Sequence, residues 1–245
     1  MIFCTQRRCF RWREHGPNTG TIMDRSALTA RPGNRLPEQL PVAGQLALGL
    51  ERMRDTLLYV PRALQPGQRA PLILFLHGAG GQAAGALSLL LPFADTYGLL
   101  VAAPSSRDST WDGIRGGYGP DVDLINRALE RVFELVPVDP QRVAGGGFSD
   151  GASYALGLGL ANGNLFSKII AFSPGFVPRG PRVGKPGIFV SHGDADAVLP
   201  IDRTSRRLVP ALQKEGFDVR YREFRGPHTV PAHLAQEAIE WLTWG

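Results

Sequence analysis

Five residues in the middle of the chain, Gly147-Phe148-Ser149-Asp150-Gly151, constrain its fold more than any other segment. They follow an apolar run over residues 142–146 and precede a helix-like stretch that begins at Ala152. A strand, a sharp turn and a helix at this spacing present the serine hydroxyl at the end of the strand. The serine needs a strained backbone there, and a side chain at either glycine would collide with the neighbouring strand or helix. An ordinary glycine-rich loop is the alternative interpretation of these five residues.

Ser149 is a candidate nucleophile, and a neutral serine hydroxyl attacks a carbonyl carbon only when a base takes its proton. Histidines follow it at positions 192, 228 and 233. His192 ends an apolar strand, which favours a structural role, and His233 falls inside the expected C-terminal helix. His228 stands in a loop between a strand and that helix, where a mobile base can lie. The sequence therefore favours His228 as the base.

A catalytic histidine also needs a carboxylate that holds its second ring nitrogen and stabilises the imidazolium. Asp194 and Asp196 both follow a strand and lie between the serine and His228 in the chain. Asp194 is nearer to the strand end, where it can fix the turn by accepting backbone N–H groups. Asp196 is therefore the preferred acid. We expect Asp202 to cap the helix that follows it.

Acyl transfer through a serine also needs two N–H donors for the oxyanion of the tetrahedral intermediate. The backbone N–H of Asp150, directly after the nucleophile, is one candidate. The second is expected from the glycine-rich loop His77-Gly78-Ala79-Gly80-Gly81, which follows the apolar strand at 72–76, and Ala79 is the expected donor. Phosphate binding by this loop is disfavoured because no Gly-Lys-Ser or Gly-Lys-Thr follows it.

Apolar strands alternate with helical patterns along the chain, which predicts a doubly wound, mostly parallel sheet of about eight strands that is buried on both faces. The expected strands span residues 45–50, 56–60, 72–76, 99–103, 142–146, 168–172, 187–191 and 219–224. The expected helices span residues 82–97, 121–135, 152–161, 202–215 and 231–244.

The segment after the strand at 168–172 decides whether the cleft is covered. Residues 173–186 are few and rich in Pro and Gly, so no cap domain fits there and we expect an open cleft. Trp111 and Phe176 lie on loops that leave the carboxyl ends of strands, where open α/β sheets bind their ligands. Both are candidate substrate contacts, and packing in the core is an equally good interpretation for each.

The positive charge of the chain is concentrated at its N-terminus. The formal net charge is +5, and residues 1–35 hold seven Arg against two acidic residues, so the rest of the chain is balanced. We expect residues 1–35 to be a basic, disordered extension and residues 36–245 to be one catalytic domain. A neutral body does not favour nucleic-acid binding. An organelle-type presequence is another interpretation of this segment. We favour Met23 as the natural start, which would leave Cys4 and Cys9 outside the protein and the body without thiolate metal sites.

Targeting signals are weak in this sequence. No uninterrupted stretch of about 18 apolar residues is present, so no membrane span is expected. The N-terminal segment lacks the apolar core of a secretory signal, and we therefore expect a cytoplasmic protein.

Four motifs together resemble the serine carboxylesterases of the phospholipase/carboxylesterase and acyl-thioesterase group. These motifs are residues 77–81, residues 147–151, His192-Gly193-Asp194-Ala195-Asp196 with Leu199-Pro200, and Gly226-Pro227-His228. They cover about residues 55–243, with a further similarity to esterases related to polyhydroxybutyrate depolymerase and feruloyl esterase. The resemblance implies an α/β-hydrolase fold without a cap, Asp196 as the triad acid and His228 as the base. Asp150 replaces the Gln of acyl-protein thioesterases, which argues against protein depalmitoylation.

The motifs and the resemblance predict a serine carboxyl-ester hydrolase that acts on small or short-chain esters through an acyl-enzyme, without metal or cofactor. Its expected catalytic residues are Ser149, Asp196 and His228, and its expected partner is a small-molecule ester. One alternative is a catalytically weak, ligand-binding protein of the same fold. Another is an acyl-thioester hydrolase. Dienelactone hydrolysis would more naturally use a Cys nucleophile.

Overall fold

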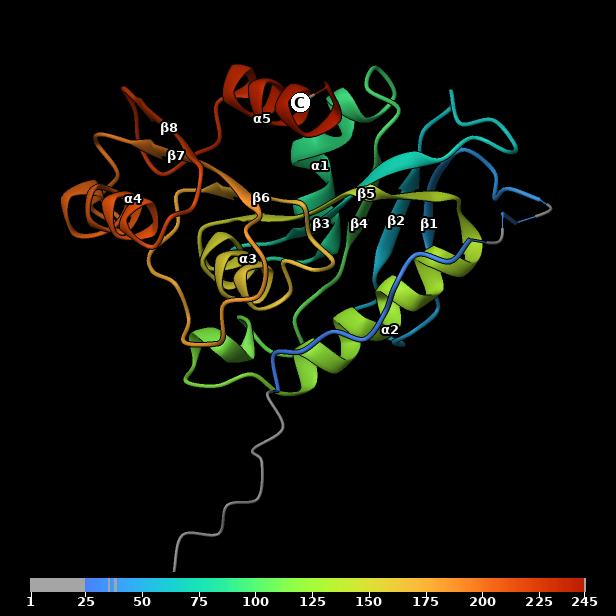
Figure 1. Cartoon of the computed structure of the whole chain (residues 1–245), viewed down its shortest axis with the longest axis horizontal. Helices are drawn as coiled ribbons and strands as arrows, with labels where there is room; N and C mark the ends of the chain where they lie inside the picture. Colours follow the sequence, from blue (N-terminus) through green and yellow to red (C-terminus); the bar gives the residue numbers. More distant parts are fainter. Residues whose placement is uncertain (1–24, 35, 38, 245) are drawn as a thin grey trace, which may run out of the picture.

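The computed structural model describes residues 25–34, 36–37 and 39–244 of the chain (Figure 1). Eight strands form one sheet in the order β1-β2-β4-β3-β5-β6-β7-β8. β1 pairs antiparallel with β2, and β2 pairs antiparallel with β4, whereas every other neighbouring pair is parallel. The strands are β1 (Gly44–Ala47), β2 (Leu57–Val60), β3 (Ala70–Leu76), β4 (Leu100–Ala103), β5 (Val138–Phe148), β6 (Lys168–Phe172), β7 (Gly187–Gly193) and β8 (Val219–Phe224).

Five α-helices cover the two faces of this sheet (Figure 1). One face is covered by α2 (Pro120–Leu135), α3 (Asp150–Ala161) and α4 (Ser205–Lys214), and the other by α1 (Ala83–Ala94) and α5 (Ala232–Trp244). Two short 3-10 helices, Asp112–Ile114 and Ile201–Arg203, lie in loops. Among the described residues no helix is both long and apolar enough to cross a membrane.

The burial of β3 on both faces explains why the central strands do not alternate apolar with polar residues. Leu72 and Leu74 pack in the core beneath α2 and α3, whereas Ile73 and Phe75 pack in the core beneath α1 and α5. Successive side chains of a strand point to opposite faces, so helices on both faces require an apolar residue at every position. The expected doubly wound, mostly parallel sheet of eight strands is confirmed, and only the loop at residues 173–186 stands where a cap would be inserted.

Several element boundaries differ from those expected from the sequence, and the largest changes are at the starts of β5 and α4. β5 begins at Val138, because residues 138–141 extend the strand beyond its apolar part. α4 begins at Ser205, so the expectation that Asp202 caps it is wrong. Asp202 lies in a 3-10 helix and accepts a hydrogen bond from Arg206 Nη1 at 2.7 Å. The 3-10 turn after Pro200 uses the residues that the sequence pattern assigned to the first turn of α4.

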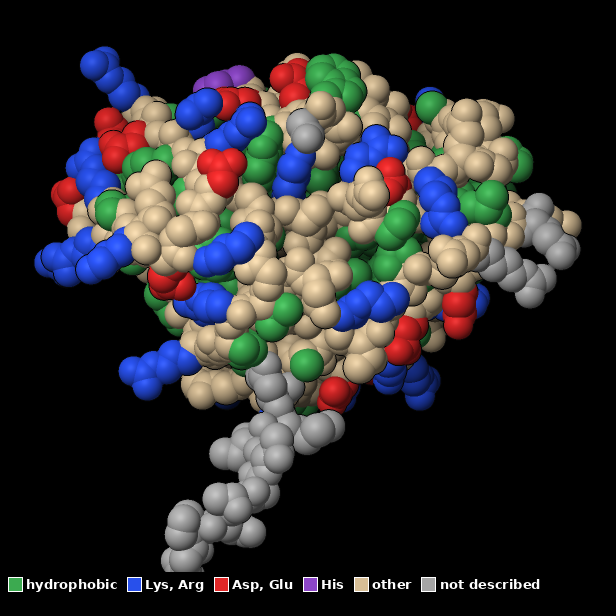
Figure 2. All heavy atoms as spheres, in the orientation of Figure 1, with side chains coloured by type: hydrophobic (Ala, Val, Ile, Leu, Met, Phe, Trp, Pro, Cys, Tyr) green, Lys and Arg blue, Asp and Glu red, His purple; other side chains and the backbone are tan. Residues whose placement is uncertain are grey.

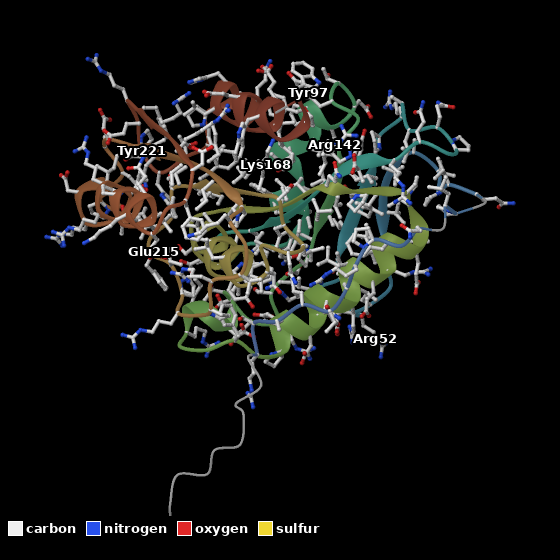
Figure 3. All side chains as sticks on the ribbon, viewed as in Figure 1. Arg52, Tyr97, Arg142, Lys168, Glu215 and Tyr221 are labelled. Carbon is white, nitrogen blue, oxygen red and sulfur yellow. The ribbon has the colours of Figure 1, made fainter. Side chains whose placement is uncertain are left out.

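Basic side chains of the sheet hold the end of α5 in place (Figure 3). Lys168 Nζ, from β6, donates to the carbonyl oxygen of Trp241 at 2.5 Å, and Arg142 Nη1, from β5, donates to that of Thr243 at 3.5 Å. Cations at the C-terminus of a helix satisfy its last carbonyls and complement its dipole. α5 follows the loop that carries His228, so its attachment helps to fix that loop on the sheet.

Residues 25–34 differ from the expected disordered extension. Leu28 and Ala30 are buried against α2 and α3. Asn162, at the end of α3, accepts a hydrogen bond from the N–H of Leu28 at 2.7 Å and donates one to the carbonyl oxygen of Ser26 at 2.7 Å. This part of the predicted extension belongs to the folded domain, and the domain boundary expected at residue 35 lies too late. Residues 1–24, which include Met23 and both cysteines, lie outside the described residues.

Charged side chains of both signs intermix on the face drawn in Figure 2. Ion pairs form among the exposed and half-buried charged side chains of the described residues, such as Arg206 with Glu223 and Arg182 with Glu215. The exposed pairs contribute little to stability, but they leave no wide field of one sign over this face. This arrangement agrees with a balanced charge in the body of the chain.

We expect Asn162→Ala to lower the free energy of unfolding by about 1–3 kcal/mol, because the buried N–H of Leu28 and the carbonyl of Ser26 lose their partner. Urea denaturation followed by circular dichroism measures this loss. Asn164→Ala is the control, because Asn164 is exposed two residues away and should change stability by less than about 0.5 kcal/mol. Equal stabilities of the two variants would show that Asn162 does not hold residues 25–34 in place.

Candidate active site

Ser149 lies in the tight turn between β5 and α3, with a backbone φ of 58° and ψ of −120°. This left-handed region is unfavourable for a residue with a side chain and is kept only where the surrounding structure enforces it. A Cβ on Gly147 would lie 2.5 Å from the carbonyl of Gly151, and a Cβ on Gly151 would lie 2.5 Å from the carbonyl oxygen of His77. The strained serine and the need for both glycines are therefore confirmed.

The structure brings together the three side chains that the sequence selected. His228 Nε2 lies 2.9 Å from Ser149 Oγ, and His228 Nδ1 lies 2.5 Å from Asp196 Oδ2. The serine hydroxyl therefore donates to Nε2, and Nδ1–H donates to the carboxylate. The three residues follow β5, β7 and β8, whose carboxyl ends lie at one edge of the sheet. His233 lies on α5 with an exposed side chain, away from this arrangement.

Asp196 is buried and its carboxylate is ionised. Burial alone would raise its pKa, but hydrogen bonds from the backbone N–H of Leu199 and from His228 outweigh burial and hold the pKa below its usual range. The N–H groups of Val198 and Leu199 reach Oδ1 at 2.9 and 2.8 Å. Asp194 is exposed and accepts the N–H of Gly226 at 3.1 Å, which is the turn-fixing role expected for it.

The glycine-rich loop at residues 77–81 lies directly against the serine. A Cβ on Gly78 would be 3.2 Å from Ser149 Cβ. In the described part of the chain, no hydrogen bond joins the N–H of Ala79 to a protein acceptor. The N–H of Asp150 belongs to the first turn of α3 and has no acceptor within the helix. Both expected donors are therefore available to a ligand beside Ser149.

His77 ties this loop to the loop after β4, a function that its sequence position did not reveal. The ring is buried, and burial lowers its pKa, so His77 is neutral. Its Nδ1–H donates to the carbonyl oxygen of Gly78 at 2.7 Å, and its Nε2 accepts the N–H of Ser106 at 2.9 Å. A neutral imidazole can make both bonds because it carries one donor and one acceptor.

Arg54 supports the same loop and was also missed by the sequence analysis. Its Nη2 donates to the carbonyl oxygen of Gly81 at 2.8 Å and its Nε to that of Ser106 at 2.8 Å. Two further bonds, from Gly80 N–H to the carbonyl oxygen of Ser109 at 2.6 Å and from Ala83 N–H to Ser105 Oγ at 2.9 Å, complete the attachment. No motif or spacing connects Arg54 with these loops, so the sequence held no signal for it.

Trp111 does not line the cleft, and its interpretation as a substrate contact is wrong. The side chain is fully buried between the rings of His77 and Tyr154, with ring centroids 4.8 and 5.3 Å away. Its indole N–H donates to the carbonyl oxygen of His77 at 2.9 Å. The large apolar ring is therefore core, and its one polar atom has a partner there.

Phe176 is 45% exposed and lines a groove with a volume of about 320 Å³. The other lining residues come from the two loops around it, and they include Ile114, Gly117, Tyr118 and Arg179. Gly175 N–H donates to Ser153 Oγ at 2.8 Å, and this hydroxyl donates to the carbonyl oxygen of Ser149 at 3.2 Å. The loop with Phe176 is thus attached to the first turn of α3, close to the serine.

We expect stability to fall between pH 7 and pH 5. Burial lowers the pKa of both His77 and His192, so the folded chain keeps them neutral at pH values where the unfolded chain protonates them near pH 6.5. The unfolded state then binds more protons, and acidification favours unfolding by at most about 1.4 kcal/mol per pH unit for each histidine. The pKa of Asp196 is held below its usual range, so its contribution is lost only at lower pH.

Urea unfolding at a series of pH values from 5 to 7.5 measures this slope. His77→Gln should reduce it, because one of the two buried neutral histidines is removed. His233→Gln is the control with an exposed histidine and should keep the wild-type slope. A wild-type slope in His77→Gln would contradict the assignment of the pH dependence to the buried rings.

Comparisons with known proteins give a consistent set of relatives. The profile of the phospholipase/carboxylesterase family matches residues 121–243, just over half of the chain. The proposed esterase NocK of Nocardia uniformis subsp. tsuyamanensis is 30% identical over 159 residues, which are 59% of this chain and 46% of NocK. The chain thus spans about half the length of this curated relative.

Solved structures of esterases share the fold. The esterase PE8 superimposes with a TM-score of 0.61 at 23% identity, over 76% of this chain and 95% of PE8. Esterase 2 of the Planctomycetes species Thermogutta terrifontis, solved with butyrate bound, gives a TM-score of 0.62 at 18% identity, over 82% of this chain and 94% of that protein. At these identities the similarity establishes the architecture of the sheet and its helices.

Proposed function

The chain belongs to the phospholipase/carboxylesterase family, and on this premise we propose that it is a serine hydrolase of carboxylic esters. The observation that carries the proposal is the hydrogen-bonded series from Ser149 Oγ through His228 to Asp196 Oδ2, with distances of 2.9 and 2.5 Å. A nucleophile, a base and a carboxylate in this order are the arrangement that activates a serine. We assign Ser149 as nucleophile, His228 as general base and Asp196 as the triad acid.

The geometry supports a two-step acyl transfer. His228 Nε2 takes the proton of Ser149 as Oγ attacks the ester carbonyl carbon, and the N–H groups of Ala79 and Asp150 stabilise the oxyanion. The tetrahedral intermediate expels the alcohol, which receives the proton from His228, and an acyl-enzyme remains. Water then attacks the acyl carbon while His228 takes its proton, and His228 returns this proton to Ser149 Oγ as the carboxylic acid leaves. Asp196 stays ionised throughout and stabilises the imidazolium.

The side chain of Asp150 makes a contact separate from that of its backbone N–H group, because it reaches the loop that carries Thr110. Asp150 Oδ2 accepts the hydroxyl of Thr110 at 2.7 Å. The negative charge at the start of α3 is favoured by the helix dipole. We propose that this bond keeps the carboxylate turned away from the oxyanion, while the backbone N–H of the same residue faces it.

We expect Ser149→Ala to abolish hydrolysis of p-nitrophenyl acetate and labelling by a fluorophosphonate, because the attacking oxygen is removed. Ser88→Ala is the control, since Ser88 is exposed on α1, and should keep both properties. Circular dichroism confirms that both variants are folded. Hydrolysis in Ser149→Ala at the wild-type rate would reject the enzyme in favour of a ligand-binding protein of this fold.

The missing cap leads to a proposal about the substrate. Each methylene of an acyl chain adds roughly 0.8 kcal/mol only where a surface buries it, and the groove beside Phe176 has a volume of about 320 Å³. We propose that short-chain esters are the substrates, an idea supported by the butyrate complex of the Thermogutta terrifontis esterase. The cytoplasmic location expected from the sequence stays a prediction.

With p-nitrophenyl esters from acetate to palmitate, we expect the specificity constant to be highest for acyl chains of about two to six carbons. The reason is that the favourable contribution of each methylene ends where the wall of the cleft ends. The rate should also rise smoothly through the critical micelle concentration of the longer esters. A maximum at palmitate, or a jump in rate when micelles form, contradicts the short-chain proposal.

A further inference from the structure

We propose that His192 is a positioning residue that holds the carboxylate of Asp196 in the orientation that His228 needs. This inference rests on the proposed function, in which Asp196 is the triad acid. The sequence indicated only a structural histidine at the end of a strand. The structure places its ring directly on the acid.

The ring of His192 is fully buried and both of its nitrogens have partners. Nε2 lies 2.8 Å from the carbonyl oxygen of Leu199 and 3.1 Å from Asp196 Oδ2. Neither oxygen can donate, so we assign the proton of the neutral ring to Nε2. Nδ1 lies 2.7 Å from Ser205 Oγ and accepts the proton of this hydroxyl. The tautomer is thus set by the two acceptors at Nε2, and Ser205, from the first turn of α4, holds the ring by donating to Nδ1.

The carboxylate of Asp196 accepts three hydrogen bonds, and the Nε2–H group of His192 faces it as a fourth polar contact. Its Oδ1 accepts the N–H groups of Val198 and Leu199 at 2.9 and 2.8 Å. Its Oδ2 accepts Nδ1–H of His228 at 2.5 Å and faces Nε2–H of His192 at 3.1 Å. Rotation of the carboxylate about its last bond would break several of these bonds at once. Oδ2 is therefore kept on the line between the two imidazoles.

A neutral imidazole suits this position better than an apolar or a cationic side chain. With an apolar residue at position 192, His228 would be the one side-chain donor to Asp196 Oδ2. The carbonyl oxygen of Leu199 would also lose the hydrogen bond from His192. A cation would pair with Asp196 and weaken the stabilisation that the carboxylate offers to the imidazolium of His228. Burial lowers the pKa of His192, which agrees with a neutral donor.

Four charged or titratable groups face His192. Asp196 and His228 belong to the series already described. Glu223 lies opposite His192 in the register of β7 and β8, and it pairs with Arg206 of α4 at 2.5 Å. This ion pair neutralises Glu223, so Asp196 is the uncompensated charge beside the ring.

Steady-state kinetics of two His192 variants test the proposal with p-nitrophenyl acetate as substrate. We expect His192→Leu to lower kcat on the order of 10²-fold with KM nearly unchanged, the effect of a misplaced catalytic group. His192→Gln should recover a large part of kcat, because its amide can still donate to Asp196. Ser191→Ala is the control: Ser191 is the buried neighbour in β7, its hydroxyl has no hydrogen-bond partner among the described residues, and it should keep the wild-type kcat.

The pH dependence of kcat/KM separates positioning from a loss of folded protein. Its acid limb reports the protonation of the base in the free enzyme. In His192→Leu, one donor to Oδ2 is lost, the negative charge of Asp196 acts more strongly on His228, and the acid limb should move to higher pH. In His192→Gln the limb should stay near the wild-type position. Two results for His192→Leu overturn the proposal. One is a lower maximum of kcat/KM whose acid limb stays in place or moves to lower pH, and the other is a wild-type kcat.

Two further variants keep the outcome interpretable. If His192→Leu does not fold, Ser205→Ala removes the hydroxyl that holds the ring of His192 at Nδ1, and kcat should fall several-fold with the same upward movement of the limb. A wild-type kcat and limb in Ser205→Ala would then overturn the proposal. Ser149→Ala is measured in parallel. Activity in that variant rejects the proposed function itself, whereas an inactive Ser149→Ala beside an unaffected His192→Leu rejects the positioning role alone.

Discussion

The close approach of α3 to the end of β3 is the contact on which the site depends. Gly151, in the first turn of α3, lies so near the carbonyl oxygens of Leu76 and His77 that a Cβ has no room. The chain can therefore make this turn only with a glycine at that position, and the turn forces Ser149 into a left-handed conformation with φ of 58°. The same approach places the loop at residues 77–81 beside the serine. The positions of Ser149 and of the loop at residues 77–81 are thus set by one packing constraint.

Two buried neutral histidines perform similar tasks on either side of this contact. His77 directly follows β3 and joins the glycine-rich loop to the loop after β4 through Gly78 and Ser106. His192 lies at the end of β7 and contacts the loop of Asp196 through Leu199. Each ring uses one nitrogen as donor and the other as acceptor, which only the neutral form can do. Burial keeps both neutral, so the fixing of the loops and the depressed pKa values have one cause.

The surroundings of the cleft depend on the short loop at residues 173–186, which stands where a cap would be inserted. In the part of the chain that the structure describes, only this loop stands between β6 and β7. Trp111 turns inward and supports His77, which leaves Phe176 as the exposed aromatic ring of the groove. The short loop at residues 173–186 is the basis of the proposed preference for small acyl groups, because each methylene of an acyl chain contributes only where a surface buries it.

The sequence by itself determined the fold class and indicated Ser149, Asp196 and His228. Apolar runs and helical periodicity indicate which side chains are buried, so they predict the strands and helices. Residues that follow parallel strands meet at one edge of the sheet, so their positions in the chain indicate which of them lie together. Only the tertiary structure decided the direction of Trp111, the start of α4 after a 3-10 turn, and the packing of residues 25–34 around Asn162. It also decided that His192 contacts Asp196. These features depend on how loops fold back on the body, and the partners of such contacts are distant or irregularly spaced in the chain, so no local pattern encodes them.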